Sequence, residues 1–314
     1  MANTYVHPGF GTAYRKVQAW HAHDGSAWRA LKKVYCHDGT DWRLVFVADW
    51  IQMGPSRDSR GIVEFFGTII SANPSLDGVD LFQGGGWYRV GNDPFFPPKT
   101  ESVCVVSGVL YAIGWYGLYF YTDSDLYSGS WTQVSTTPYL PYLPWFITAI
   151  YGVIHTASNN GIHYWNGTTW SVFGSALTYA KHVALVCGNT YASTDYGLFL
   201  LSGGVWVSVA TSGSARCIIE FDGVPHSAQG AGVYRLDGTS WTLVGSLSNV
   251  YWLLDVNGKL FAATGGGVYW LDGSSWTKVG LMSNLTYSLS VVQGYLRAST
   301  NSGVFFWPIP STDL

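Results

Sequence analysis

The stretch GVYWLDGSSWTKVG at residues 267–280 decides the fold, because close copies of it recur along the whole chain. The copies share a glycine, an apolar strand rich in aromatic residues, a short turn and a tryptophan. Their leading glycines lie 35 to 44 residues apart, at Gly78, Gly117, Gly161, Gly197, Gly232, Gly267 and Gly303. A period of this length indicates a repeat architecture in which each unit is one supersecondary element.

A second hairpin precedes each copy. Before Gly267 it reads VYWLLDVNGKLFAATG, and Asn-Gly between two apolar runs favours a two-residue hairpin turn. Each repeat therefore supplies four short antiparallel strands, termed A to D in chain order. Four strands in about 35–45 residues are typical of the blade of a β-propeller.

The seventh copy, GVFFWP from Gly303, ends before it reaches a strand D. The missing strand is supplied by DWIQMG at residues 49–54, which matches SWTKVG at 275–280. One strand-D tryptophan then belongs to each blade, and we expect these residues to pack between blades: Trp50, Trp87, Trp131, Trp170, Trp206, Trp241 and Trp276. The sequence predicts an all-β fold, a seven-bladed β-propeller of four-stranded antiparallel blades at residues 49–314, closed by residues 49–54. Such closure leaves no unpaired blade edge; an open or eight-bladed array is the alternative.

Composition limits the other possibilities. Charged residues make up 11% of the chain, against about 25% in an average soluble domain, and aromatic residues 17%. No apolar run approaches the roughly 20 residues of a membrane helix, and the first 16 residues lack a secretory signal, so we expect synthesis in a cytoplasm and no membrane insertion. A net charge of −3 without a basic cluster argues against nucleic-acid binding. The four cysteines lie far apart, which favours free thiols over a disulfide framework.

Residues 1–48 carry a different repeat. VQAWHAHDGSAWRAL at 17–31 is followed by KKVYCHDGTDWRLVF at 32–46, and each unit predicts a β-hairpin with an Asp-Gly turn. Two such hairpins cannot bury a core of their own, so they need a partner surface. We expect an N-terminal β-hairpin domain that attaches the propeller to another protein or to a further copy in a homo-oligomer.

The pattern of aromatic, x-x-Asp-Gly-x-x-Trp-Arg over about 35 residues resembles short repeats at the ends of bacteriophage tail and tail-fibre proteins. The resemblance implies a virion tail component that is made in the host cytoplasm. Residues 1–48 would anchor it to other tail proteins, and the propeller would bind a host surface receptor or polysaccharide. One alternative is a purely structural protein that decorates or caps the particle. Another is a carbohydrate-active enzyme of the sialidase-like propeller type.

In such blades the A–B and C–D turns share one face of the ring, here called the turn face. The B–C turns and D–A links share the other, here called the link face. The turn face is uniform from blade to blade, whereas the link face varies, and variable loops on a rigid scaffold usually carry binding. We therefore predict a ligand site at Arg57, Arg60, Phe95, Phe96, Trp115, Tyr116, Tyr139, Tyr142, Asn160, Asp195 and Tyr196. Their aromatic rings could stack on sugars while the polar groups bind hydroxyls. The alternative is that these loops only cover blade edges.

Catalytic and metal-binding patterns are sparse. Glu64 and Glu220 fall in strand A, where a carboxylate could face the channel. No P-loop, GxSxG or HExxH motif is present, and the Asp-Gly-x-x-Trp turns are shorter than the sialidase box, so we predict no enzymatic activity, no catalytic residue and no cofactor. His21 and His23 lie on one face of a strand and could bind a metal only if further copies added ligands. Surface or turn-packing histidines are the alternative.

Overall fold

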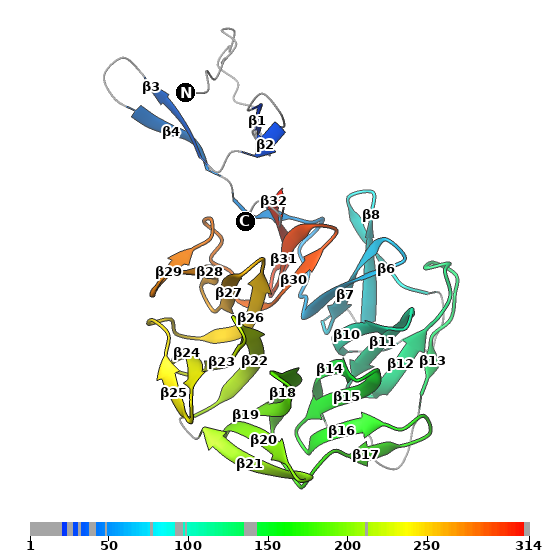
Figure 1. Cartoon of the computed structure of the whole chain (residues 1–314). Coiled ribbons are helices and arrows are strands. Elements are labelled where there is room, and N and C mark those ends of the chain that lie inside the picture. The colour runs from blue at the N-terminus through cyan, green and yellow to red at the C-terminus, as the bar shows by residue number, and fades with distance from the viewer. Residues whose placement is uncertain are drawn as a thin grey trace.

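The computed structural model describes residues 21–23, 28–30, 33–37, 42–47, 49–75, 78–91, 97, 99–134, 143–210 and 213–310. Every regular element in these ranges is a strand, and seven antiparallel four-stranded sheets follow one another along the chain. The sheets are arranged as blades around a centre, with the strands A innermost and the strands D at the circumference (Figure 1). The predicted seven-bladed β-propeller is confirmed. No described helix is long and apolar enough to cross a membrane.

The blades repeat one strand order. Blade one contains β6 (Gly61–Phe65), β7 (Thr68–Asn73), β8 (Gly78–Gln83) and β9 (Gly86–Arg89). Blade two contains β10 (Thr100–Val106), β11 (Val109–Gly114), β12 (Gly117–Tyr121) and β13 (Thr132–Gln133). Blade three contains β14 (Pro144–Ile150), β15 (Val153–Ser158), β16 (Gly161–Trp165) and β17 (Trp170–Val172). Blade four contains β18 (Ala180–Val186), β19 (Asn189–Thr194), β20 (Gly197–Ser202) and β21 (Val205–Ala210).

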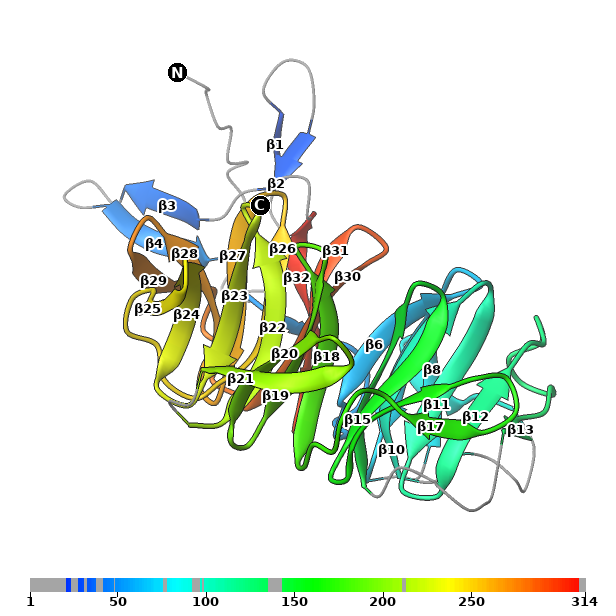
Figure 2. The ribbon, with the colours of Figure 1, turned by 60° about the horizontal axis from the view of Figure 1, so that its bottom comes forward.

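The remaining blades keep this order. Blade five contains β22 (Ala215–Phe221), β23 (Val224–Gln229), β24 (Gly232–Asp237) and β25 (Ser240–Leu243). Blade six contains β26 (Val250–Val256), β27 (Lys259–Thr264), β28 (Gly267–Asp272) and β29 (Ser275–Lys278). Blade seven contains β30 (Thr286–Val292), β31 (Tyr295–Thr300) and β32 (Gly303–Pro310), together with β5 (Ile51–Gln52). Figure 2 shows the strands running between the two faces of the ring.

Strand β5 closes the ring as predicted. Ile51 pairs with Phe306 and Gln52 with Phe305, and the backbone N–H of Met53 donates to the carbonyl of Val304 at 2.8 Å. Trp50 lies beside Trp307, with 5.6 Å between the ring centroids. The strand that completes the last blade therefore comes from the N-terminal side, which joins segments about 250 residues apart.

The A–B turns have one conformation in all seven blades. Each contains two residues with positive φ, the second always a glycine, as a type I′ hairpin turn requires. The first positions are Phe66, Ser107, Tyr151, Cys187, Asp222, Asn257 and Gln293. Only some of these residues favour a left-handed backbone, so the hairpin geometry imposes the conformation on the others. The A–B turns on the turn face are therefore uniform in backbone conformation although their first residue varies.

A tryptophan and a glycine couple each blade to the next. In five blades the strand-D indole N–H donates to a carbonyl at the end of strand D in the preceding blade, at 2.6–2.9 Å, from Trp50, Trp87, Trp131, Trp206 and Trp276. The carbonyl is followed by a glycine with positive φ: Gly280, Gly54, Gly91, Gly174 and Gly245 in the same order. A Cβ on any of these glycines would come within 3.3 Å of the indole it faces. The predicted role of the tryptophans in packing between blades is confirmed: these five add the hydrogen bond, while Trp170 and Trp241 pack against apolar residues of the preceding blade.

The two exceptions follow a change in sequence. The indole nitrogens of Trp170 and Trp241 have no hydrogen-bond partner among the described residues. The strands D before them end in TQVS and VSVA, so Ser135 and Ala210 stand where the other blades have glycine. Ala210 instead continues β21 and pairs with Leu198. At Ala210 the strand continues in place of the left-handed turn that presents the carbonyl to the next indole.

We expect Gly245→Ala to destabilise the propeller by more than Gly258→Ala. Both glycines have positive φ, but a Cβ at Gly245 would lie 2.8 Å from the Ser274 carbonyl oxygen and 3.0 Å from Trp276, whereas nothing lies within 4 Å of one at Gly258. Gly258→Ala should cost about 1–2 kcal/mol from backbone strain alone. Chemical denaturation of both variants measures the difference, and equal losses would contradict a steric role for Gly245.

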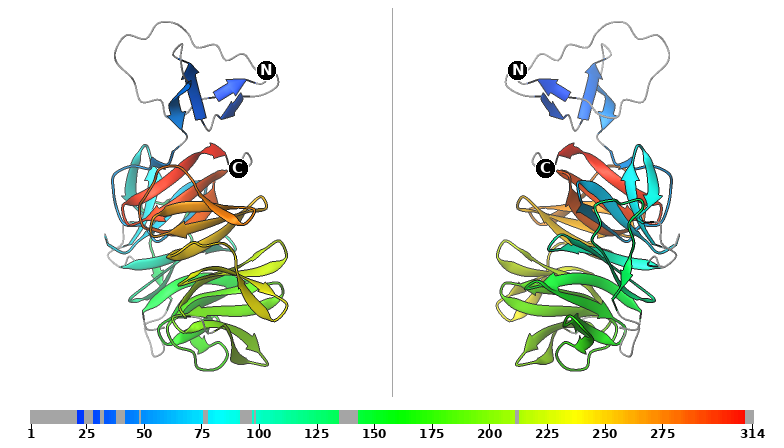
Figure 3. Two further views of the ribbon diagram at one scale, coloured as in Figure 1. Left: turned by 90° about the vertical axis from the view of Figure 1, so that its left-hand side faces the viewer. Right: turned by 90° about the vertical axis from the view of Figure 1, so that its right-hand side faces the viewer.

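Two separate hairpins precede the propeller. β1 (His21–His23) pairs with β2 (Trp28–Ala30), and β3 (Lys33–His37) pairs with β4 (Trp42–Val47). The chain enters β5 from the turn face, because strand D of each blade begins there, so hairpins that precede β5 could lie against that face. Figures 1 and 3 show them instead beyond the rim of the ring, next to blade seven. The link face is therefore clear of these strands.

Candidate ligand-binding site

Seven side chains surround the mouth of the central channel on the link face, one from each blade. In six blades the register between strands A and B shifts at the second residue of strand A, which is left without a partner. A β-bulge of this kind re-aims a side chain. The residues are Arg60, Glu101, Trp145, Lys181, Arg216, Tyr251 and Tyr287, here called the mouth ring; Arg60 is the one that precedes its strand without a bulge.

Four members of the mouth ring form a continuous arc over blades five, six, seven and one. The Arg216 guanidinium lies 5.1 Å from the centre of the Tyr251 ring, and the Arg60 guanidinium lies 3.8 Å from that of Tyr287. Tyr251 and Tyr287 meet edge to face at 6.3 Å between centroids. A cation thus stands at each end of a pair of tyrosines, and each contact is of the cation–π or aromatic type.

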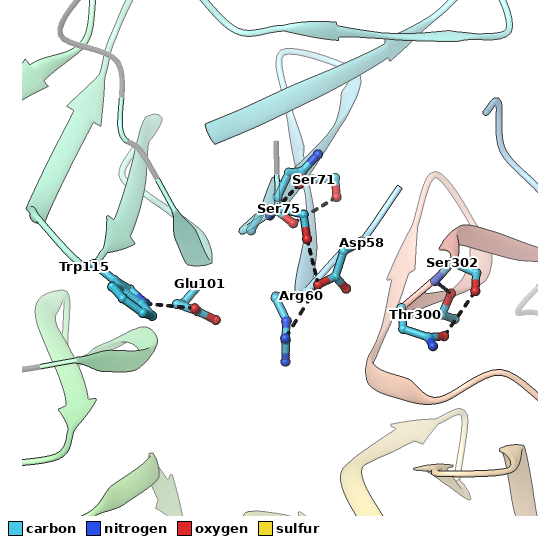
Figure 4. Close-up of polar contacts among 11 residues, drawn as sticks. Asp58, Arg60, Ser71, Ser75, Glu101, Trp115, Thr300 and Ser302 are labelled. Atoms are coloured by element: carbon cyan, nitrogen blue, oxygen red, sulfur yellow. Dashed lines mark hydrogen bonds and ion pairs between the residues drawn. The ribbon is translucent and has the colours of Figure 1, made fainter. Parts of the chain in front are cut away.

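Glu101 continues the ring beyond Arg60. Its carboxylate accepts the indole N–H of Trp115 at 3.2 Å, and Lys99 lies 4.3 Å above the same indole. Burial raises the pKa of Glu101 above its ordinary value, although the Arg60 charge and the Trp115 hydrogen bond oppose the shift. Figure 4 shows Glu101 and Trp115 on one side of the mouth, with Arg60 and its partner Asp58 beside them.

Blades three and four complete the circle. Lys181 lies 4.3 Å above the Trp145 ring and forms an ion pair with Asp195 at 3.2 Å. Trp145 in turn donates its indole N–H to the Asn159 side chain at 2.8 Å. Tyr179 and Tyr196, which lie close in sequence to Lys181 and Asp195, meet edge to face at 5.8 Å between ring centroids. Both side chains are exposed.

The channel is closed below the mouth by three aromatic side chains. These are the residues that follow the mouth ring in blades three, four and six: Phe146, His182 and Trp252. Their centroids are 4.4 Å apart for Phe146 and His182, 5.1 Å for His182 and Trp252, and 5.5 Å for Phe146 and Trp252. Blades three and six are far apart around the ring, so contact between them means that side chains fill the centre. The mouth ring therefore lies above an aromatic floor.

His182 is the polar member of this floor. Its side chain is 4% exposed, and its Nδ1 has no hydrogen-bond partner among the described residues. Burial lowers its pKa to about 3, so the imidazole is neutral at physiological pH.

The structure brings part of the predicted site to the mouth. Arg60 belongs to the mouth ring, Trp115 bonds to Glu101, and Asp195 pairs with Lys181. Tyr116 and Tyr196 are exposed by 56% and 60% in the adjoining B–C turns. Phe95, Phe96, Tyr139 and Tyr142 lie outside the described residues.

Two predicted residues have structural partners. Arg57 forms an ion pair with Asp80 at 2.8 Å, and Asn73 donates to the same carboxylate at 2.8 Å, which ties the link before blade one to its strands. Asn160 accepts a hydrogen bond from Ser158 at 2.7 Å within its own turn. Both contacts hold the loops in place.

The two channel candidates among the glutamates occupy the turn face. The carboxylate of Glu64 accepts the backbone N–H of Gln293 at 3.3 Å, and that of Glu220 accepts the backbone N–H of Cys187 at 2.8 Å. Each carboxylate reaches the A–B turn of the preceding blade. These contacts give both glutamates a structural role in joining blades, and the Glu64 contact reinforces the joint between blades one and seven.

Most of the mouth ring was missed from the sequence, although a signal exists. Aligning the seven strands A places one varying residue directly before each apolar run, in R-GIVEF, E-SVCVV, W-FITAI, K-HVALV, R-CIIEF, Y-WLLDV and Y-SLSVV. The varied composition of the loops predicts a site in the B–C turns and D–A links instead. The bulge that re-aims this position is a property of strand pairing.

Other candidate sites are weaker. A groove of about 340 Å³ between blades two and three is lined by Tyr111, Phe120, Gln133 and Trp165 among others, and by no charged side chain. Within the described ranges, His, Cys, Asp and Glu side chains form no group of three that could hold a metal ion. For His21 and His23 the structure gives the backbone of β1 alone. Cys104, Cys187 and Cys217 are free, and burial raises the pKa of Cys104 and Cys217 to about 12, so both are inert thiols.

Comparisons with known proteins support the architecture. No family model matches the sequence, and no curated protein matches it significantly. Among solved structures, the chain is similar to the extracellular domain of a proposed hybrid two-component system from B. thetaiotaomicron, with a TM-score of 0.70 and 12% identity over 83% of this chain and 40% of that one. The chain thus spans about 40% of the length of that ectodomain.

Two further structures match over most of their own length. Streptogramin B lyase gives a TM-score of 0.66 at 12% identity, covering 82% of this chain and 96% of the lyase. The WD40 β-propeller domain of Doa1 gives 0.65 at 13% identity, covering 81% and 95%. The three neighbours are the extracellular domain of a two-component system, a lyase and a WD40 domain. What they share with this chain is the β-propeller fold, which hosts catalytic and non-catalytic proteins alike.

Proposed function

We propose that this chain is a non-catalytic ligand-binding propeller whose site is the mouth ring, and that residues 1–48 attach it to a larger assembly. The observation that carries the proposal is the ring itself. Seven varying side chains, three cationic, three aromatic and one acidic, gather at one point of a scaffold that is otherwise repetitive. Aromatic side chains beside a few fixed polar groups are the usual lining of a small-ligand site.

We further propose that the assembly is a virion tail and the ligand a host surface receptor, such as a glycan. Support comes from the resemblance of the N-terminal repeats to those of tail and tail-fibre proteins. In this arrangement residues 1–48 bind other tail proteins or further copies. The link face, clear of β1–β4, is available to the host surface. Aromatic side chains beside polar groups suit sugar rings, which offer an apolar face and a rim of hydroxyls.

We expect the double variant Trp115→Ala, Tyr287→Ala to bind its target about 5- to 150-fold more weakly than the unmodified chain. Losing two stacking surfaces of about 0.5–1.5 kcal/mol each accounts for a loss of that order. The measurement is binding of the purified full chain to host cells and to their isolated surface polysaccharide. Tyr151→Ala is the matched control, because Tyr151 is 80% exposed but lies in an A–B turn on the turn face.

The outcomes separate the alternatives. Target binding that is equal in the double variant and in the control would overturn the assignment of the mouth ring. No binding by the unmodified chain would favour a structural protein that decorates or caps the particle. Release of sugar from the polysaccharide over time would identify a carbohydrate-active enzyme.

A further inference from the structure

The cations of the mouth ring differ in how far they are neutralised. Lys181 pairs with Asp195 at 3.2 Å, which is hydrogen-bonding distance. Arg60 faces Asp58 at 3.6 Å, beyond ordinary hydrogen-bonding distance, and also lies in the field of Glu101. Arg216 is exposed, and no carboxylate of the described residues lies within ion-pair distance of it. Arg216 is therefore the ring cation with the most unsatisfied charge.

The setting of Arg216 leaves its donors available. Its guanidinium carbon lies 5.1 Å from the centre of the Tyr251 ring, a cation–π contact that does not use the N–H donors. A guanidinium without an ion pair among the described residues is suited to bidentate recognition of a carboxylate, sulfate or phosphate. The opposite end of the arc is different, because Glu101 and Asp58 surround Arg60 and would repel a second anion there.

The arc therefore has a direction. An anion fits at the Arg216 end, aromatic surface follows at Tyr251 and Tyr287, and hydroxyl-binding groups of both signs stand at the Arg60 and Glu101 end. Sugars that carry an acidic group offer the matching sequence of an anion, an apolar ring face and hydroxyls.

We propose that the ligand is an anionic saccharide whose acidic group binds Arg216, with its sugar rings against Tyr251 and Tyr287 and its hydroxyls toward Arg60 and Glu101. This inference rests on the proposed function and narrows it to one ligand class. The bound acid is a carboxylate, a sulfate or a phosphate carried on a sugar, and the test distinguishes these three.

The test uses the full chain on an array of polysaccharides at low ionic strength. The probes are neutral dextran, polygalacturonate, the same polymer after carboxyl reduction, dextran sulfate and a phosphate-bearing teichoic acid. Arg216→Gln removes the charge and keeps a polar side chain. Arg235→Gln is the matched control, since Arg235 is half exposed on β24, away from strand A, and pairs with Asp237 of its own strand at 2.8 Å.

We expect the unmodified chain to prefer at least one acidic polymer over its neutral counterpart by tenfold or more, and the preferred polymer identifies the acid. Arg216→Gln should abolish that preference and leave neutral binding within twofold, while Arg235→Gln should keep the preference. Binding of neutral polymers that Tyr287→Ala weakens, without an acidic preference, would overturn this inference and leave the mouth ring as the site. A preference that survives in Arg216→Gln would also overturn it. No binding to any polymer would overturn the glycan proposal together with this inference.

Discussion

Trp50→Ala is expected to lower the free energy of unfolding by about 3–5 kcal/mol, the range for removing a buried tryptophan from a core. Trp50 is 8% exposed, packs beside Trp307 and donates its indole N–H to the Val279 carbonyl of blade six at 2.8 Å. It precedes the strand that completes blade seven, so its loss weakens the joint that closes the ring. Denaturant titration, followed by tryptophan fluorescence and circular dichroism, measures the change.

Trp241→Ala provides the comparison within the same repeat. Trp241 occupies the equivalent position in blade five, but it is only partly buried and its indole nitrogen has no partner among the described residues. We expect a clearly smaller loss, because less apolar surface and no hydrogen bond are removed. Equal losses of unfolding free energy in the two variants would show that the closing joint contributes no more to stability than other joints. They would also show that burial at this position does not govern stability.

Acidification should destabilise the propeller, with His182 as the largest single contributor. Burial lowers the pKa of its imidazole to about 3 in the folded chain, against about 6.5 when the chain is unfolded. Between about pH 3 and pH 6.5 the His182 imidazole is protonated in the unfolded chain but neutral in the folded chain. Its contribution to the free energy of unfolding is therefore fully present above about pH 6.5 and is lost as the pH falls toward 3. The slope contributed by one such group approaches about 1.4 kcal/mol per pH unit.

Three other buried histidines act in the same direction. Burial lowers the pKa of His155, His163 and His226, so each adds to the loss of stability below its unfolded value. His182→Phe should remove the steepest part of the pH dependence, because a phenylalanine suits contact with Phe146 and Trp252 and cannot be protonated. His155→Phe is the control: it should leave the component that extends toward pH 3.

The measurement is the urea midpoint of each chain from pH 7 to pH 3. A pH profile of His182→Phe that matches that of the unmodified chain would contradict the placement of a neutral imidazole in the channel floor. Since the floor lies below the mouth ring, the same variant also tests whether the mouth ring depends on the floor. Ligand binding at pH 7 should then change little.

The joints between blades also explain how a chain with few charges holds a ring together. Directional contacts between neighbours are made by the indole N–H groups of strand D and by carboxylates such as Glu64 and Glu220 on the turn face. Apolar packing between sheets supplies the rest, as in the cluster of Trp50, Leu289 and Trp307 with residues of blade six. Apolar burial has little directional preference, so the hydrogen bonds fix the register of one blade against the next.

The number of blades and their closure were accessible from the sequence because they depend on local pattern. A glycine, an apolar run, a turn and a tryptophan repeat at a fixed interval, and strand pairing between sequence neighbours follows from short turns. The match of residues 49–54 to strand D identified the closing strand, since the seventh copy lacked that piece. The left-handed glycines after strand D could also be read, because Gly54 and Gly280 recur four residues after their tryptophans.

The site depended on tertiary structure. Glu101, Arg216 and Tyr287 are far apart in the chain and reach the mouth of one channel only when seven blades close into a ring. A bulge at the second residue of strand A directs these side chains to the mouth, and register shifts of this kind arise from pairing between strands. The floor of Phe146, His182 and Trp252 requires contact across the channel between blades three and six. The repeat by itself determined the seven blades and the strand that closes the ring, because each blade pairs strands that are neighbours in sequence and residues 49–54 match strand D of the repeat. Which side chains form the mouth ring was decided by the tertiary structure, because only closure of the ring brings one varying residue from each blade to a common axis.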